Sequence, residues 1–235
     1  MAKGSPSFVC QSCGAVHAKW SGKCDACGGW NTITEEGAPV PIGAGAAKRL
    51  KGRRFALEDL KTEDKAPPRR VTGIAEFDRV TGGGIVPGSA LLIGGEPGIG
   101  KSTLLLQLAA SLSRAGRRAI YFSGEEAAAQ VRLRAERLGL SDAPVELACE
   151  TSLASILATL EHGKPADLVV IDSIQTLWAE AIEAAPGTVS QVRASAQALI
   201  RHAKRAGSAL LLVGHVTKDG QIGRASCRER VCLAV

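Results

Sequence analysis

Aromatic residues are scarce in this chain of 235 residues: they make up 3% of it, against 45% for hydrophobic residues as a whole. A core of this composition must consist mainly of Leu, Ile, Val and Ala side chains. No apolar run approaches the roughly 20 residues that a membrane-spanning helix needs. The first seven residues lack the apolar segment of a secretory signal peptide. These absences predict a cytoplasmic protein with no membrane partner.

Acidic residues are also fewer than basic ones, 23 against 29, which gives a formal net charge of +6. This modest excess permits binding to nucleic acid but does not establish it. The length suits one domain of ordinary size together with a small one.

The most informative motif is the octapeptide G-E-P-G-I-G-K-S at residues 95–102, which fits the phosphate-binding pattern G-x-x-x-x-G-K-[ST]. Its glycines let successive backbone N–H groups point at one anion. Lys101 adds positive charge at the outer phosphates, and the Ser102 hydroxyl can ligate magnesium. An apolar run precedes the loop and a helix-forming run follows it, as this motif requires. The expected nucleotide-binding residues are Gly95, Glu96, Pro97, Gly98, Ile99, Gly100, Lys101, Ser102 and Thr103.

Four of the seven cysteines form two C-x2-C pairs separated by ten residues: Cys10, Cys13, Cys24 and Cys27. Two such pairs can aim four thiolates at one point, which makes a tetrahedral site suited to zinc. Two disulfides or a redox motif are the alternatives, disfavoured by a cytosolic setting and by the paired arrangement. We therefore expect a zinc finger over residues 1–33 that folds on the metal.

Trp20 and Trp30 flank the second cysteine pair. We favour packing in the small core of the finger for both indoles, over a platform on which bases stack. Residues 34–68 show no periodicity and include a basic cluster between residues 48 and 54. A solvated linker is the favoured interpretation there, and an arm that contacts phosphates is the alternative.

Strand-like and helical segments alternate beyond the linker. The expected strands lie at 90–94, 118–123, 145–148, 168–172 and 209–213, and the expected helices at 103–110, 125–138, 152–162 and 189–206. Such alternation predicts an α/β fold with a mostly parallel sheet covered by helices on both faces.

Residues at three strand ends complete an expected site for nucleotide hydrolysis. Asp172 ends an apolar strand, where it can hold the magnesium shell through water; a turn-forming role is the alternative. Glu125 is placed to orient or deprotonate the attacking water, with Glu126 as the alternative. His215 follows a strand and could contact the terminal phosphate and report its loss. The expected catalytic residues are Lys101, Glu125 and His215, and the expected magnesium ligands are Ser102 and Asp172.

Together these features resemble the bacterial RadA (Sms) family of RecA-like DNA repair proteins. The resemblance extends to about residue 221 and rests on the finger, the phosphate loop and motifs at 72–74, 78–80, 82–84, 121–126, 170–176, 185–193 and 214–220. It implies a RecA-like P-loop ATPase core over residues 69–221, with ATP as substrate and Mg²⁺ and Zn²⁺ as cofactors. It further implies a DNA-dependent ATPase, a homo-oligomeric ring on single-stranded or branched DNA, that processes recombination intermediates with the RecA recombinase.

Two other functions stay open beside a repair motor. One is a RecA-like nucleotide-dependent sensor without DNA translocation, and the other is a non-functional fragment of the repair protein. If DNA is bound, the loop at 179–188 and the loop beginning at residue 215 are the expected contacts.

Residues 222–235 depart from the family. Residues 222–231 match one reading frame of a common sequencing-library adapter. We therefore interpret 222–235 as a non-native tail on a core that is incomplete at its C-terminus, a divergent native tail being the alternative. Because the tail is polar and arginine-rich, we expect it to stay unpacked and add no strand to the sheet. A chain of this kind is expected to be poorly soluble or inactive in ATP hydrolysis.

Overall fold

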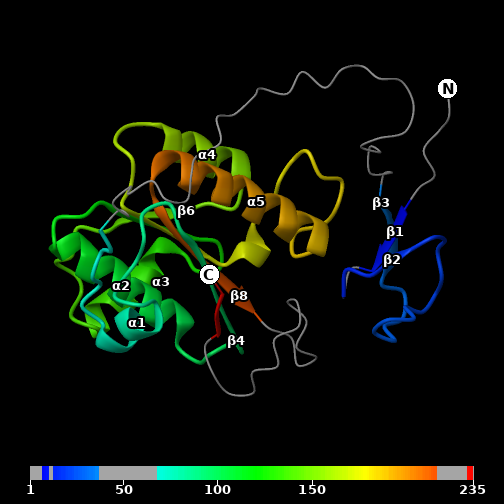
Figure 1. Ribbon diagram of the computed structural model, residues 1–235, viewed down its shortest axis with the longest axis horizontal. Coiled ribbons are helices and arrows are strands. Elements are labelled where there is room, and N and C mark those ends of the chain that lie inside the picture. The colour runs from blue at the N-terminus through cyan, green and yellow to red at the C-terminus, as the bar shows by residue number, and fades with distance from the viewer. Residues whose placement is uncertain (1–6, 11–12, 37–67, 216–231, 235) are drawn as a thin grey trace, which may run out of the picture. The chain divides into compact units, whose positions relative to one another are not determined.

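The computed structural model describes residues 7–10, 13–36, 68–215 and 232–234 (Figure 1). The chain divides into two compact units, Met1–Pro67 and Pro68–Val235. The basic cluster and the rest of the linker between residues 37 and 67 lie outside the described residues.

The first unit is built on a small antiparallel sheet. Strand β1 (Ser7–Cys10) lies between β2 (Val16–His17) and β3 (Ile33–Glu36). Cys10, Cys24 and Ile33 form a buried cluster against which Cys13 and Cys27 pack, and Val9 is also buried. The cysteine pairs therefore supply most of the interior themselves.

The prediction that both tryptophans pack into this core is wrong. The side chain of Trp20 is 57% exposed and that of Trp30 is 71% exposed. The physical reason is volume, because the four cysteines and Ile33 already fill the interior of so small a unit. Both indoles are left on its surface.

The second unit is a six-stranded sheet in the order β6-β5-β7-β8-β4-β9. Five of these strands are parallel: β4 (Ala90–Gly95), β5 (Ala119–Ser123), β6 (Glu146–Cys149), β7 (Leu168–Asp172) and β8 (Ala209–His215). The helices are α1 (Ala75–Val80), α2 (Lys101–Arg114), α3 (Ala128–Arg137), α4 (Leu153–Glu161) and α5 (Val189–Ala206), with a 3-10 turn, η1 (Ile174–Thr176). The predicted fold class is confirmed.

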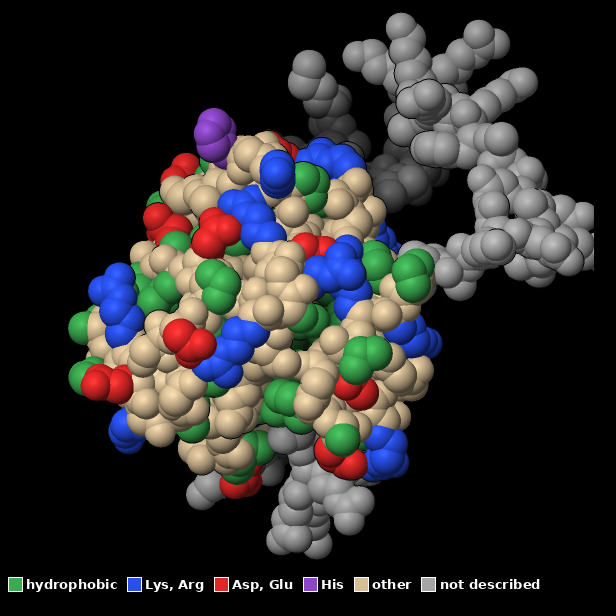
Figure 2. All heavy atoms as spheres, turned by 90° about the vertical axis from the view of Figure 1, so that its left-hand side faces the viewer, with side chains coloured by type: hydrophobic (Ala, Val, Ile, Leu, Met, Phe, Trp, Pro, Cys, Tyr) green, Lys and Arg blue, Asp and Glu red, His purple; other side chains and the backbone are tan. Residues whose placement is uncertain are grey.

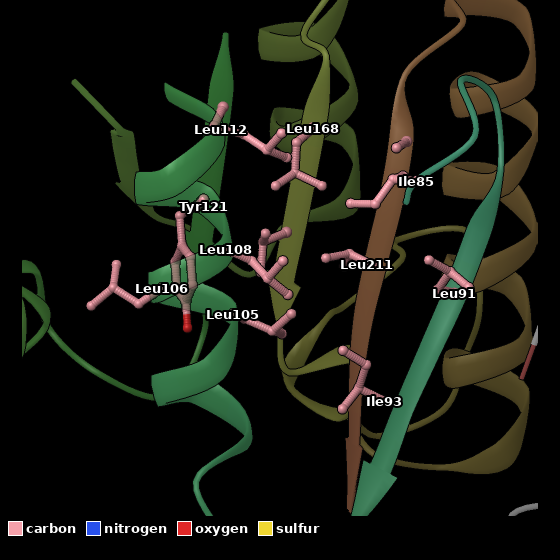
Figure 3. Packing of buried hydrophobic residues seen from close by; sticks show 14 of the residues in the cluster. Ile85, Leu91, Ile93, Leu105, Leu106, Leu108, Leu112, Tyr121, Leu168 and Leu211 are labelled. Carbon is pink, nitrogen blue, oxygen red and sulfur yellow. The ribbon is translucent and has the colours of Figure 1, made fainter. Parts of the chain in front are cut away.

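Alternate residues of the buried strands face opposite helical layers. Leu168, Val170 and Leu211 pack with the leucines of α2, in the layer that also holds α1 and α3 (Figures 1 and 3). Their strand neighbours Val169 and Leu210 pack with α4 and α5 on the other face. Strands buried on both faces explain the nearly continuous apolar runs in the sequence.

Two element boundaries differ from the predicted ones. Helix α3 begins at Ala128 and not at 125, because the hydroxyl of Ser123 accepts from the N–H of Glu126 and donates to its carbonyl. This turn replaces the first turn of the predicted helix. Strand β8 runs two residues further than predicted, so His215 is its last residue and does not follow it.

The expectation that the tail adds no strand to the sheet is wrong for its last residues, 232–234. Strand β9 (Cys232–Ala234) pairs antiparallel with β4, with Ile93 opposite Leu233. The backbone groups on that side of β4 would otherwise lack ladder partners, and residues 231–235 are an apolar run that can supply them. Residues 216–231 lie outside the described residues, so the rest of the expectation for the tail is not tested.

None of the helices in the described part of the chain has the length and apolar character needed to span a bilayer. On the face of the second unit that Figure 2 shows, basic and acidic side chains are interspersed. This face therefore presents no continuous patch of one sign.

Candidate active site and metal centre

The carboxyl ends of four adjacent strands bring the sequence-predicted residues to one edge of the sheet. Ser123 lies opposite Asp172 in the β5–β7 ladder, and Gly95 lies opposite His215 in the β4–β8 ladder. Since β7 also pairs with β8, the phosphate loop, the Asp172 carboxylate and the segment around Glu125 all meet there. Ligands of open parallel sheets bind at such an edge.

The phosphate loop connects β4 to α2 in a conformation that only glycine adopts easily. Gly98 and Gly100 have φ values of 83° and 94°, in the left-handed region. Gly100 directly precedes the first residue of α2, and residues 96–100 are exposed. The loop backbone is therefore open to solvent at the positive end of a helix of 14 residues, which favours an anion.

Lys101 reaches back over this loop. Its side chain is buried, and its ammonium group donates to the carbonyls of Gly95 at 2.8 Å and Glu96 at 2.7 Å. Burial lowers the pKa of the ammonium group, while the negative charges of Asp172 and Glu125 oppose that shift. The charge of Lys101 is thus held in place over the loop by two of its backbone oxygens.

Asp172 is buried at the end of β7 and is tied to a neighbouring strand. The hydroxyl of Tyr121, on β5, donates to its Oδ2 at 2.5 Å. Burial and the charge of Asp172 raise the pKa of Tyr121 far above its usual range, so the tyrosine acts only as a donor. Ser102 lies partly exposed in the first turn of α2. A hydroxyl and a carboxylate are oxygen ligands of the kind that Mg²⁺ prefers.

Glu125 is held by two donors on a single oxygen. Ser173 Oγ donates to Glu125 Oε1 at 2.5 Å, and Nε2 of His215 lies 2.8 Å from the same oxygen. Burial raises the pKa of the Glu125 carboxyl. The two hydrogen bonds and the nearby charges of His215 and Lys101 lower it by more than burial raises it, so the pKa lies below its ordinary value. Oε2 accepts no hydrogen bond from any residue in the described ranges, so it is the oxygen free to take a proton.

The neighbouring carboxylate of Glu126 has a different role. It forms an ion pair with Arg134 of α3, whose side chain is mostly buried. The backbone of Glu126 is bound to Ser123 as well, so its carboxylate is fixed toward α3. The carboxylates of the two neighbouring residues therefore face different partners: Glu126 faces Arg134, whereas Glu125 faces Ser173 and His215.

His215 has one ring nitrogen on Glu125. Because a carboxylate oxygen only accepts, Nε2 must carry the proton of that contact. Nδ1 is buried and has no hydrogen-bond partner in the part of the chain that the structure describes. The carbonyl of His215 accepts from Gln175 of η1 at 3.3 Å, which connects the end of β8 to the segment after Asp172.

The sequence did not predict a role in this site for three residues: Tyr121, Ser173 and Arg134. Ser173 stands directly after Asp172 in the motif 170–176, and Tyr121 lies two residues before the end of its strand. Their roles depend on which strands are neighbours, so the motifs alone could not assign them.

The loop at 179–188 is organised by a buried amide. Gln191 of α5 donates to the carbonyls of Ala179, Ile182 and Ala184, and its side-chain oxygen accepts from the N–H of Ala179. Glu180 and Glu183 are exposed on this loop. The loop is therefore well fixed but carries exposed negative charge.

The four predicted metal ligands gather at one point in the first unit. The ligand atoms of Cys10, Cys13, Cys24 and Cys27 all lie within 4.8 Å of one another. The sulfurs of Cys10 and Cys27 are 3.7 Å apart and those of Cys13 and Cys24 are 3.6 Å apart. Tetrahedral Zn–S bonds of about 2.3 Å require a sulfur separation of about 3.8 Å. These four cysteines form no disulfides with one another, and the spacing of their sulfurs fits zinc.

The surroundings of the sulfurs also suit a bound cation. Burial and the neighbouring thiols raise the pKa of Cys13 to about 12, and binding of a metal would favour its thiolate form. His17 Nε2 lies 3.4 Å from the sulfur of Cys24, and the Thr32 hydroxyl lies 3.2 Å from that of Cys10. Both can donate to a thiolate, as outer-shell partners of metal ligands do.

Comparisons with known proteins identify one family in each of the two units. Residues 53–221 match the AAA domain, and residues 8–35 match the rubredoxin metal binding domain. The chain therefore belongs to the AAA domain family, and its first unit contains a zinc-binding ribbon.

The relatives are bacterial DNA repair RadA proteins. The chain is 61% identical over 229 residues to DNA repair protein RadA of Brucella abortus, covering 94% of this chain and 49% of that protein. It is 46% identical over 226 residues to the Pseudomonas aeruginosa protein of that name, covering 94% of this chain and 49% of that protein. The chain spans about half the length of these relatives. The resemblance inferred from the motifs is confirmed.

Proposed function

We propose that this chain is the ATP- and zinc-binding part of a DNA-dependent ATPase of recombinational DNA repair. In this proposal it acts as a homo-oligomeric ring on single-stranded or branched DNA and processes recombination intermediates together with the RecA recombinase. The names of the relatives and the AAA domain match support DNA repair and nucleotide use.

One observation carries the proposal: Lys101, Glu125, Asp172 and His215 converge on one edge of the sheet beside an exposed phosphate loop. Lys101 and the loop amides would bind the nucleotide phosphates. Ser102 and Asp172 would hold Mg²⁺, which supplies charge neutralisation at those phosphates. Glu125 Oε2 would accept the proton of the attacking water, while Ser173 and His215 fix the other oxygen.

Replacing Lys101 tests the nucleotide site. In Lys101→Ala the phosphates lose their main side-chain counterion, so the Kd for a fluorescent ATP analogue should rise at least about tenfold. The matched control is Lys164→Ala, which removes an exposed lysine on the turn before β7. Equal affinity in the wild type and Lys101→Ala would assign nucleotide binding to other residues.

DNA dependence is tested by ATP turnover with and without single-stranded DNA, in this chain and in the Brucella abortus relative as positive control. We expect DNA to accelerate turnover, and salt to weaken DNA binding. Turnover indifferent to DNA in both proteins would favour the nucleotide-dependent sensor.

Removing the Ser173 hydroxyl should change the pH dependence of hydrolysis. Its hydrogen bond stabilises the charged form of Glu125 and lowers its pKa, so Ser173→Ala should raise that pKa. The acid limb of the kcat profile should therefore move to higher pH, and Ser173→Thr should restore it. An unchanged limb in Ser173→Ala would show that this hydroxyl does not tune Glu125.

A further inference from the structure

The two exposed tryptophans of the finger lie around one short backbone pairing. Lys23 and Trp30 form an antiparallel bridge, and the N–H of Asn31 donates to the carbonyl of Gly22 at 2.7 Å. A Cβ added to Gly22 would lie 3.9 Å from the ring of Trp20, so that indole lies against the same pairing. Both indole rings therefore lie beside the same backbone bridge, close in sequence to Cys24 and Cys27.

Positive charge accompanies the rings. The ammonium group of Lys23 lies 5.5 Å from the centroid of the Trp30 ring, and Lys19 precedes Trp20 and is exposed. The acidic residues Glu35 and Glu36 lie at the other end of β3, opposite Phe8 and Ser7. Asp25 is the remaining acid in the described part of the finger.

The surroundings of the rings favour nucleic acid over a protein partner. Along the chain, Lys19 and Ser21 flank Trp20 and Asn31 follows Trp30, and the ammonium group of Lys23 lies near the Trp30 ring, so basic and polar residues accompany both indoles. Val16, a large apolar residue of the finger that is also exposed, lies on the edge strand β2. Separate aromatic rings among cations are the arrangement on which bases stack while phosphates meet the charges.

We propose that Trp20 and Trp30 form a stacking platform for the bases of single-stranded DNA, with Lys19 and Lys23 contacting the adjacent phosphates. This inference rests on the proposed function in that DNA is the ligand. It goes further by assigning DNA contact to the finger, which is a separate unit from the loops of the ATPase core.

The test measures the binding of a fluorescein-labelled oligothymidine to the whole zinc-loaded chain, without nucleotide, by fluorescence anisotropy. Trp20→Ala and Trp30→Ala should each raise the Kd about tenfold, because a stacked base is lost. Trp30→Phe should retain most of the affinity, since a ring face remains. Lys23→Gln should reduce the salt dependence of log Kd by about 0.7, the share of one phosphate contact on a single strand.

Two controls separate this inference from the proposed function. Val16→Ala removes an exposed apolar side chain of the finger without a ring and should leave the Kd unchanged, and zinc content should be equal in all finger variants. Lys164→Ala, which removes an exposed lysine of the second unit, should also bind the oligothymidine normally, because the platform lies in the finger.

Wild-type affinity in both Trp20→Ala and Trp30→Ala would overturn the platform and leave the core loops as the DNA contacts of the proposed function. If both variants bind the oligothymidine with wild-type affinity but no longer bind a protein that the wild-type chain binds, the two rings belong to a protein interface, and the platform is overturned. No DNA binding by the wild-type chain, while the Brucella abortus relative binds, would overturn the platform alone. No binding by either protein would count against the proposed function as well.

Discussion

Glu125→Gln should abolish ATP turnover while leaving ATP binding intact. The amide keeps the shape of the side chain and can still accept from Ser173 through its oxygen, but it cannot take a proton from water. Loss of a general base typically lowers kcat by about 10² to 10⁴-fold. Phosphate release measured under saturating ATP, together with the Kd of a fluorescent ATP analogue, separates the two effects.

Glu126→Gln is the matched control for this experiment. It removes one negative charge at the adjacent residue, where the carboxylate is already paired with Arg134. We expect at most a small loss of kcat, caused by weaker anchoring of the turn before α3. The reverse result, with turnover lost in Glu126→Gln and kept in Glu125→Gln, would transfer the role to Glu126. If the wild-type chain shows no turnover, the corresponding pair of variants in the Brucella abortus relative carries the test.

The parts of the site that the sequence predicted are those encoded by short local motifs. The phosphate loop needs glycines, a lysine and a hydroxyl at fixed spacing. The continuous apolar run that ends at Asp172 is by itself enough to predict a buried strand. The cysteine pairs are equally local. Parallel strands then bring these ends together, which is why the fold class and the shared edge could be predicted.

What could not be predicted depends on strand order. Tyr121 contacts Asp172 because β5 pairs with β7, and Ser173 reaches Glu125 across the same two strands. Arg134 lies eight residues along the chain from Glu126, and it meets that carboxylate only because the Ser123 turn delays the start of α3. Neither spacing nor composition carries this information.

Two predictions were wrong because each considered a segment without its surroundings. One concerned the interior of the first unit, and the other concerned the sheet edge at β4. Trp20 and Trp30 were expected inside because indoles are large and apolar, but the cysteine cluster leaves them no room. The tail was expected to stay unpaired because its arginines suit no strand, but its last residues pair with the free side of β4. In both cases the local preference of a segment was overridden by what the rest of the unit offers.

Cys24→Ala should release the zinc and unfold the first unit while the ATPase core keeps its fold. The wild-type chain should contain about one zinc, because the four sulfurs of the cluster fit one tetrahedral ion. Three remaining thiolates bind zinc far more weakly, and a unit whose core is largely cysteine loses most of its stability, since structural zinc contributes about 10–16 kcal/mol in zinc-finger peptides. Elemental analysis should find almost no zinc in Cys24→Ala, whereas Cys149→Ala, which removes an exposed free cysteine of the core, should keep it. The Kd for an ATP analogue should be the same in both variants, because the phosphate loop belongs to the other unit. Full zinc content in Cys24→Ala would show that the metal is held by other residues.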